Sequence, residues 1–249
     1  MNPIEELIVR AESGDVEAQF DLASEYWDKG DYEQAFFWCK KAADQGHVTA
    51  QFNLGLMYDK GQGIFQDYGQ AFYWYKQSAD QGSVDAQINI GSMYYKGKGV
   101  LQDYEQAFYW YKHSADQGHE IAQFNIGLMY YKGQSVLQDY ERAYYWFEQS
   151  ADQGYAVAQF SLGIMYYEGQ GIFQDYEQAF LWFRKAAEQG NASAQNNIGF
   201  MYECGYGVKK NIKRAFDWYL KAKRNGHERA EKALKNPIFD KIRIERLIR

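Results

Sequence analysis

Histidine and cysteine are the residues of this chain whose side chains could bind a metal ion or attack a substrate. There are four histidines, and three of them, His47, His119 and His227, directly follow a glycine that ends a predicted helix. No His-x-x-x-His or Cys-x-x-Cys spacing occurs, so no pair of side chains is placed to bind zinc. The Gly-x-Ser-x-Gly pattern of a nucleophile elbow is missing as well. We therefore expect no catalytic residue, no metal site and no cofactor.

Glycine pairs such as Gly61 and Gly63 invite comparison with a phosphate-binding loop. They follow a predicted helix rather than a strand, and they recur along the chain, so we interpret them as turn residues. The flanking Asp59 and Asp67 suggest a calcium loop only superficially. The segment between them lacks the alternating oxygen ligands and the closing glutamate of such a loop.

A segment of 36 residues, His47 to Gly82, recurs along the chain almost unchanged. Its Ala50-Gln51 pair returns at the same step as far as Ala194-Gln195. Trp74 recurs at the same step as far as Trp218, and Trp38 lies one step before it. Self-similarity at one fixed period of this length is typical of proteins built from stacked repeats.

Each repeat contains two predicted helices joined by a glycine-rich loop. In the second repeat they cover residues 48–59 and 68–81, because apolar residues recur there at helical spacing. Asp67 can cap the second helix, and Gln70 is placed to complete a capping box. Gly82 ends that helix, because a glycine adopts the left-handed conformation without strain.

Gly55 lies in the middle of the first predicted helix and recurs in the four following repeats. A glycine inside a helix costs about 1 kcal/mol relative to alanine. We therefore expect a close backbone contact with a neighbouring helix at this position. Ala23 holds the equivalent place in the first repeat.

The repeat pattern Ala-x-x-x-Leu-Gly-x-x-Tyr-x-x-Gly-x-Gly, followed by Asp-x-x-x-Ala-x-x-Trp-Tyr-x-x-Ala-Ala-x-x-Gly, resembles the Sel1-like repeat, a relative of the tetratricopeptide repeat. Some positions depart from it; Ser135, for example, replaces a loop glycine. The resemblance implies an all-α, right-handed α/α superhelix. Its six repeats are predicted at residues 15–46, 47–82, 83–118, 119–154, 155–190 and 191–226.

Residues 1–14 and 227–249 flank the predicted repeats. We interpret the first as an N-terminal capping helix and the second as C-terminal capping helices, so that residues 1–249 form a single solenoid. The segment that begins at Pro237 carries Ile238, Phe239, Ile242 and Leu247 roughly on one side. An alternative is that this segment is a free tail that binds another chain or a membrane surface.

The resemblance also implies which side chains of the first helices face the concave groove of the solenoid. They form ladders of asparagine beside phenylalanine, leucine and tyrosine, a composition suited to an extended peptide and its apolar side chains. The alternative is that these aromatic rings are simply buried and that the asparagines bond to nearby backbone. The predicted partner-binding residues are Phe52, Asn53, Leu56, Ile88, Asn89, Tyr95, Phe124, Asn125, Leu128, Tyr131, Phe160, Tyr167 and Asn197.

The second helices are rich in aromatic residues over their whole circumference. Four consecutive aromatic residues, such as Phe72 to Tyr75, cannot all be buried, so one column must be exposed. We expect it to be the column that drifts to a charge, and self-association through it is possible. That column comprises Phe37, Tyr73, Tyr109, Tyr145, Leu181 and Asp217.

Charge is distributed unevenly along the chain. Residues 1–204 hold 13 Lys and Arg against 28 Asp and Glu, a net charge of −15, whereas residues 205–249 carry +9. An acidic body argues against nucleic-acid binding. The beginning of the sequence has no basic flank and no long apolar core, and no apolar run reaches the length of a membrane span. We expect a cytoplasmic setting and no disulfide between Cys39 and Cys204.

Together these patterns favour a non-catalytic scaffold that binds another protein or an extended peptide. A second hypothesis is an immunity or inhibitor protein that neutralises a toxin or effector enzyme, since an acidic body would suit a basic target. A third is a hydrolase of the cysteine-rich Sel1-like type. The cysteine pair that this branch carries in each repeat is missing, which argues against that role.

Overall fold

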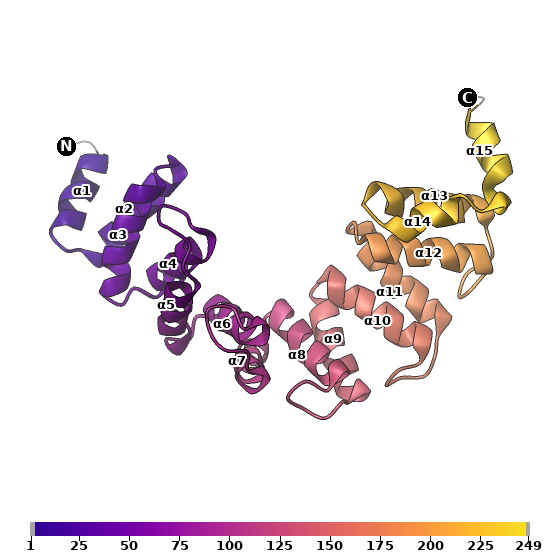
Figure 1. Ribbon diagram of the computed structural model, residues 1–249, viewed down its shortest axis with the longest axis horizontal. Coiled ribbons are helices and arrows are strands. Elements are labelled where there is room, and N and C mark those ends of the chain that lie inside the picture. Colours follow the sequence, from indigo (N-terminus) through magenta and orange to yellow (C-terminus); the bar gives the residue numbers. More distant parts are fainter. Residues whose placement is uncertain (1–2, 248–249) are drawn as a thin grey trace. The chain divides into compact units, whose positions relative to one another are not determined.

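The computed structural model describes residues 3–247, which are helical apart from short loops (Figure 1). Residues 1, 2, 248 and 249, which the predicted caps include, lie outside this range. The first helices of the six repeats are α2 (Val16–Asp28), α4 (Val48–Lys60), α6 (Val84–Lys96), α8 (Glu120–Lys132), α10 (Ala156–Glu168) and α12 (Ala192–Cys204). The second helices are α3 (Tyr32–Asp44), α5 (Tyr68–Asp80), α7 (Tyr104–Asp116), α9 (Tyr140–Asp152), α11 (Tyr176–Glu188) and α13 (Ile212–Arg224).

The helices pack in chain order within two compact units, Met1–Gly118 and His119–Arg249. In each unit a first helix packs on the second helix of its repeat, and that second helix packs on the first helix of the next repeat. The predicted all-α solenoid of about six repeats is thereby confirmed.

The loops between the paired helices close on the first helix. The Asp67 side chain caps α5 as predicted, accepting from the amides of Gly69 and Gln70 at 2.8 and 3.0 Å. The capping box is wrong, however, because the amide of Asp67 donates to the carbonyl of Tyr58 at 3.0 Å and needs nothing from Gln70. The same backbone bond recurs from Asp103, Asp139, Asp175 and Asn211. After α5, Gly82 adopts the predicted left-handed conformation, with φ of +93°.

From the second repeat onward, the glycine in the middle of the first helix makes room for a ring of the paired helix. A Cβ atom on Gly55 would lie 2.5 Å from Cδ1 of Tyr75, on the second helix of the same repeat. The predicted close approach is present, but its partner is a side chain rather than a backbone. In the first repeat Ala23 replaces the glycine and the smaller Cys39 replaces the ring.

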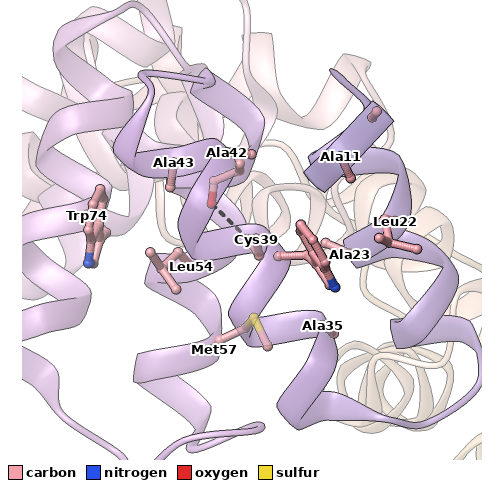
Figure 2. Packing of buried hydrophobic residues seen from close by; sticks show 13 residues of the cluster. Ala11, Leu22, Ala23, Ala35, Cys39, Ala42, Ala43, Leu54, Met57 and Trp74 are labelled. Carbon is pink, nitrogen blue, oxygen red and sulfur yellow. Dashed lines mark hydrogen bonds between the residues drawn. The ribbon is translucent and has the colours of Figure 1, made fainter. Parts of the chain in front are cut away.

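Small residues and a few large side chains fill the space between helices. In the first repeats, Leu22, Leu54, Met57 and Trp74 pack against a set of alanines (Figure 2). Cys39 lies among them, and its thiol donates to the carbonyl of Ala50 at 3.3 Å (dashed line in Figure 2). Burial raises the pKa of this thiol to about 12. The thiols of Cys39 and Cys204 are both free.

A buried glutamine joins successive repeats. Gln159 donates to the carbonyl of Ala151, at the end of the preceding second helix, at 3.1 Å. It accepts from Gln189 at 2.8 Å, and Gln189 also donates to the carbonyl of Gly154 at 2.9 Å. Corresponding glutamine pairs occur at Gln51 with Gln81 and at other repeats. The Ala151 carbonyl also accepts from the Gly154 amide at 3.0 Å, so the glutamine adds a second bond at the helix end, while Gln189 ties Gly154 to the next repeat.

Additional helices pack at both ends of the repeat series. The first, α1 (Pro3–Glu12), packs on α2, while α14 (Glu228–Leu234) and the 3-10 turn η1 (Pro237–Phe239) pack on α13. Phe239 is fully buried, with its ring 5.6 Å from that of Phe216. The chain continues into α15 (Asp240–Leu247). Over the described residues, no helix combines the length and the apolar character that crossing a membrane requires.

Candidate protein-interaction surface

The thirteen predicted partner-binding residues lie on α4, α6, α8, α10 and α12, and every one of them is half-buried. Half-burial means that each side chain has part of its surface in the core and part open to a ligand. The contacts of each ladder decide how much of it is free to bind.

The phenylalanine ladder packs partly into the core. The ring centroid of Phe52 lies 5.8 Å from that of Tyr75 on the paired second helix. Phe124 contacts Phe147 at 5.4 Å and Phe160 contacts Phe183 at 5.7 Å in the same way. These phenylalanines therefore support the surface as well as contributing area to it.

The asparagine ladder divides into two kinds of residue. Asn89 shares a hydrogen bond with the hydroxyl of Tyr75, while burial of that tyrosine raises its pKa. Asn53, Asn125 and Asn197 form no side-chain hydrogen bond with any other described residue. Their amide groups are half-buried and offer a donor and an acceptor to a bound backbone.

We call the side of each unit that carries these first-helix residues the first-helix face. In the N-terminal unit this face contains a hollow of about 330 Å³ between α2 and α4. Asn53 and Leu56 line it, together with Phe20, Ser24 and Trp27 of α2. Its floor includes Cys39, which stands where the following repeats carry a tyrosine or a phenylalanine. The smaller floor residue helps to open this hollow.

Two hollows occur on the same face of the C-terminal unit. One, of about 150 Å³, is lined by Leu128 and Tyr131 of α8 and by Ile164 of α10, above Phe147. The other, of about 390 Å³, also includes Ile164 and lies between α10 and α12. Its lining comprises Ile164, Tyr167, Glu168, Phe183, Asn196, Asn197, Phe200, Met201, Tyr219, Arg229 and Ala233. The shared Ile164 makes the two hollows neighbours.

Six of the thirteen predicted residues line these hollows: Asn53, Leu56, Leu128, Tyr131, Tyr167 and Asn197. The other seven line none of the three hollows: Phe52, Ile88, Asn89, Tyr95, Phe124, Asn125 and Phe160. Arg229 could not be predicted from the sequence, because the helical pattern that begins at His227 loses the glycine and tyrosine that would set its register.

Charged groups border the hollows without filling them. Asp28 lies at the hollow of the N-terminal unit, and Glu168 and Arg229 lie at the larger hollow of the C-terminal unit. The hydroxyl of Tyr131 donates to the side chain of Gln170 at 2.6 Å. The surface thus combines apolar recesses with amides and a few charges, a composition that suits protein binding.

The second helices carry the exposed aromatic column that the sequence predicts. The exposed fractions of Phe37, Tyr73, Tyr109, Tyr145 and Leu181 lie between 45 and 52%. Asp217, the last member, is half-buried. Within residues 3–247, no three side chains of the metal-binding types gather into a possible ion site.

Comparison with known proteins relates the whole repeat region to one family. Six consecutive segments match the Sel1 repeat, at residues 16–47, 48–83, 84–119, 121–155, 156–191 and 192–227. No curated protein sequence matches the chain.

Among solved structures, c5321, a protective antigen present in uropathogenic Escherichia coli strains and displaying an SLR fold, is 34% identical, with a TM-score of 0.87. The match covers 92% of this chain and 50% of c5321, so this chain spans half the length of that protein. A Sel1 repeat protein from Oxalobacter formigenes is 30% identical over 87% of this chain and 86% of its own, with a TM-score of 0.81. The immunity protein Pa5087 from Pseudomonas aeruginosa, 18% identical over 83% of each chain with a TM-score of 0.52, shares the fold.

Proposed function

Because the chain belongs to the Sel1 repeat family, we propose that it is a non-catalytic scaffold that binds a partner protein or an extended peptide on its first-helix face. The observation that carries this proposal is the coincidence of open hollows with half-buried asparagine, leucine and tyrosine side chains of the first helices. Recesses of this kind accept the anchoring side chains that dominate protein interfaces.

The free amides favour a ligand whose backbone is available for hydrogen bonding. Asn53 and Asn197 each lie at a hollow, so an amide–backbone bond and an apolar anchor can form at the same place. A segment in extended conformation offers both a backbone donor and acceptor and alternating side chains. We propose such a segment, with leucine or aromatic anchors, as the bound element.

The proposal is tested by measuring how a partner isolated with the full chain binds to variants of the first-helix face. Tyr167→Ala and Asn197→Ala, made together, should weaken the affinity at least tenfold, since loss of an interface anchor costs about 2 kcal/mol or more. The matched control is Leu181→Ala, which changes an exposed apolar side chain on the second-helix face of the same unit. Equal binding by the wild type, the double variant and the control would refute the proposed surface. The same measurement with Asn53→Ala and Leu56→Ala, made together, tests the hollow of the N-terminal unit.

A second candidate function is that of an immunity or inhibitor protein. The observation that favours it is the net charge of −15 over residues 1–204, which would attract and hold a basic effector. Cells that produce the effector encoded beside this chain should survive when the chain is also produced. Survival that does not depend on the chain would remove this candidate and leave the general scaffold.

A further inference from the structure

The loop between the paired helices presents one fully exposed apolar side chain in each of four successive repeats. Phe65 and Leu101 in the N-terminal unit are 92 and 90% exposed, and Leu137 and Phe173 in the C-terminal unit are 91 and 95% exposed. Side chains this exposed contribute nothing to the core of their own chain. Their repetition at one place in the loop indicates that another surface covers them.

We refer to these four exposed side chains, Phe65, Leu101, Leu137 and Phe173, as the loop tips. Each is held on a rigid loop. After each tip a glutamine donates to the last turn of the first helix; Gln66, for example, bonds to the carbonyl of Asp59 at 2.7 Å and Gln174 to that of Tyr167 at 2.8 Å. Before each tip stands a half-buried Ile or Val. In the N-terminal unit Lys98, in the loop after α6, also pairs with Asp59 in the last turn of α4 at 2.7 Å. Within each unit the tips are therefore held by their own loops and lose little freedom on binding.

The order of the tips is self-complementary. Read along the chain it is Phe, Leu, Leu, Phe, and it is the same when read backwards. We propose that the loop tips form a dimerisation surface whose occupant is a second copy of this chain in antiparallel orientation, with the N-terminal unit of each copy on the C-terminal unit of the other. Phe65 then meets Phe173 of the second copy, and Leu101 meets Leu137 of the second copy, as a two-fold axis requires.

Charge supports this register at the outer loops. Lys60 and Glu168 are the last residues of α4 and α10, directly before the first and fourth of these loops. Both are exposed, and neither forms an ion pair with a described residue of its own chain. The antiparallel pairing brings them together. At the inner loops it brings Lys96 opposite Lys132 of the second copy, so the outer pairs and the apolar tips must hold the register.

The area is sufficient for a modest dimer. Eight tips, four from each copy, bury on the order of 1,200 Å² if each loses about 150 Å², which is the lower limit for stable interfaces. An anionic membrane is a poor alternative occupant, because the net charge of −15 over residues 1–204 would oppose binding to an acidic surface. The sixth repeat carries Lys209 at the tip position, so the apolar series ends there.

The test is the mass of the full chain by sedimentation equilibrium over a range of concentrations. The chain should form dimers, and Leu101→Asp should lower the association constant at least tenfold while the circular dichroism spectrum stays unchanged. Leu181→Asp, at an exposed position on the second-helix face, should leave association unchanged. A chain that stays monomeric, or a dimer that tolerates Leu101→Asp, overturns the proposal. Binding of the monomeric chain to phosphatidylcholine vesicles through these tips also overturns the proposal.

Two lysine substitutions test the register with opposite expected signs. Lys60→Glu places a carboxylate opposite Glu168 of the second copy and should weaken association about three- to tenfold, as expected for exposed charges. Lys96→Glu places a carboxylate opposite Lys132 of the second copy and should strengthen association by a similar factor. A change in the same direction for both variants contradicts the antiparallel pairing.

Disulfide cross-linking tests the same pairing at the inner tips. In a Cys204→Ser background, a Leu101→Cys chain mixed with a Leu137→Cys chain should form a disulfide between the two copies. Cross-linking of either variant with itself contradicts the antiparallel pairing.

Discussion

The contact between a helix glycine and a ring of the paired helix is set by single residues. A Cβ atom on Gly163 would lie 2.4 Å from Cδ1 of Phe183, closer than packed carbon atoms approach. Gly163→Ala therefore overpacks the repeat, at a cost of about 1–3 kcal/mol, against a gain of about 1 kcal/mol in helix propensity. We expect a net loss of about 1 kcal/mol in the free energy of unfolding, measured by urea denaturation.

The first repeat suggests the control for this prediction, since it carries Ala23 with Cys39 in place of glycine and a ring. In a Phe183→Cys background, Gly163→Ala should become neutral or stabilising because the clash is gone. Gly69→Ala, at an exposed helix position where other repeats carry glutamate, should not destabilise. If Gly163→Ala costs the same in both backgrounds, the ring does not explain the glycine.

The buried glutamine between repeats is a second residue with a defined contribution. Replacing Gln159 by leucine removes its bonds to Ala151 and Gln189, and the Ala151 carbonyl keeps only its bond from the Gly154 amide at 3.0 Å. Two lost hydrogen bonds of about 0.5–1.5 kcal/mol each cost about 1–3 kcal/mol together. We expect Gln159→Leu to lower the midpoint of urea unfolding accordingly, whereas Gln178→Leu, at an exposed position of the next helix, should change it little. A midpoint that is equal for both variants would assign the glutamine no role in joining repeats.

Element boundaries could be predicted from the sequence because the repeat fixes them several times over. The predicted helix at residues 48–59 is α4 (Val48–Lys60), and the one at 68–81 is α5 (Tyr68–Asp80). The capping box could not be decided from spacing, since it depends on where the amide of Asp67 points. That amide donates to Tyr58, a contact made only once the loop folds back.

The candidate site could be predicted only in part for a similar reason. Register alone places Asn53 and Leu56 on the first-helix face, but whether a hollow opens there depends on the size of the floor residue, Cys39. The exposed loop tips could have been predicted from the sequence, since Phe65 and Leu101 are apolar residues at one repeated loop position. A turn residue needs no apolar side chain, and this repetition is the signal on which the proposed dimerisation surface rests.

The C-terminal helices act as one element through Phe239. This side chain is fully buried against Phe216 and Tyr219 of α13. Phe239→Ala should cost about 3–5 kcal/mol, which exceeds what a short helix can lose and still remain docked. We expect hydrogen exchange to accelerate in α14 and at the end of α13, whereas Ile238→Ala, beside it but exposed, should leave exchange unchanged. Unchanged protection in Phe239→Ala would mean that these helices do not cap the series.

At the scale of the whole molecule, tyrosine hydroxyls whose pKa is raised by burial make the stability of both units depend on alkali, and some of them belong to the ring that packs beneath a first helix. That ring is Tyr75 and Tyr111 in the N-terminal unit, where burial is the main cause that raises the pKa of both hydroxyls above the usual 10.0. In the C-terminal unit the same place is held by Phe147, Phe183 and one tyrosine, Tyr219. Above pH 10 the unfolded chain loses these protons while the folded chain keeps them, so the folded state loses stability as pH rises.

Each such tyrosine contributes a slope of about 1.4 kcal/mol per pH unit from pH 10 upward, until its raised folded pKa is reached. Tyr75→Phe with Tyr111→Phe should lower stability slightly at pH 7, because the hydrogen bonds to Asn89 and Ser92 are lost. Between pH 10 and 12 the doubly substituted chain should lose stability more slowly than the wild type. Tyr73→Phe with Tyr109→Phe, at exposed positions, serves as the control and should keep the steep wild-type decline. Parallel decline in all three proteins would show that lysine deprotonation, rather than these buried hydroxyls, limits the molecule at high pH.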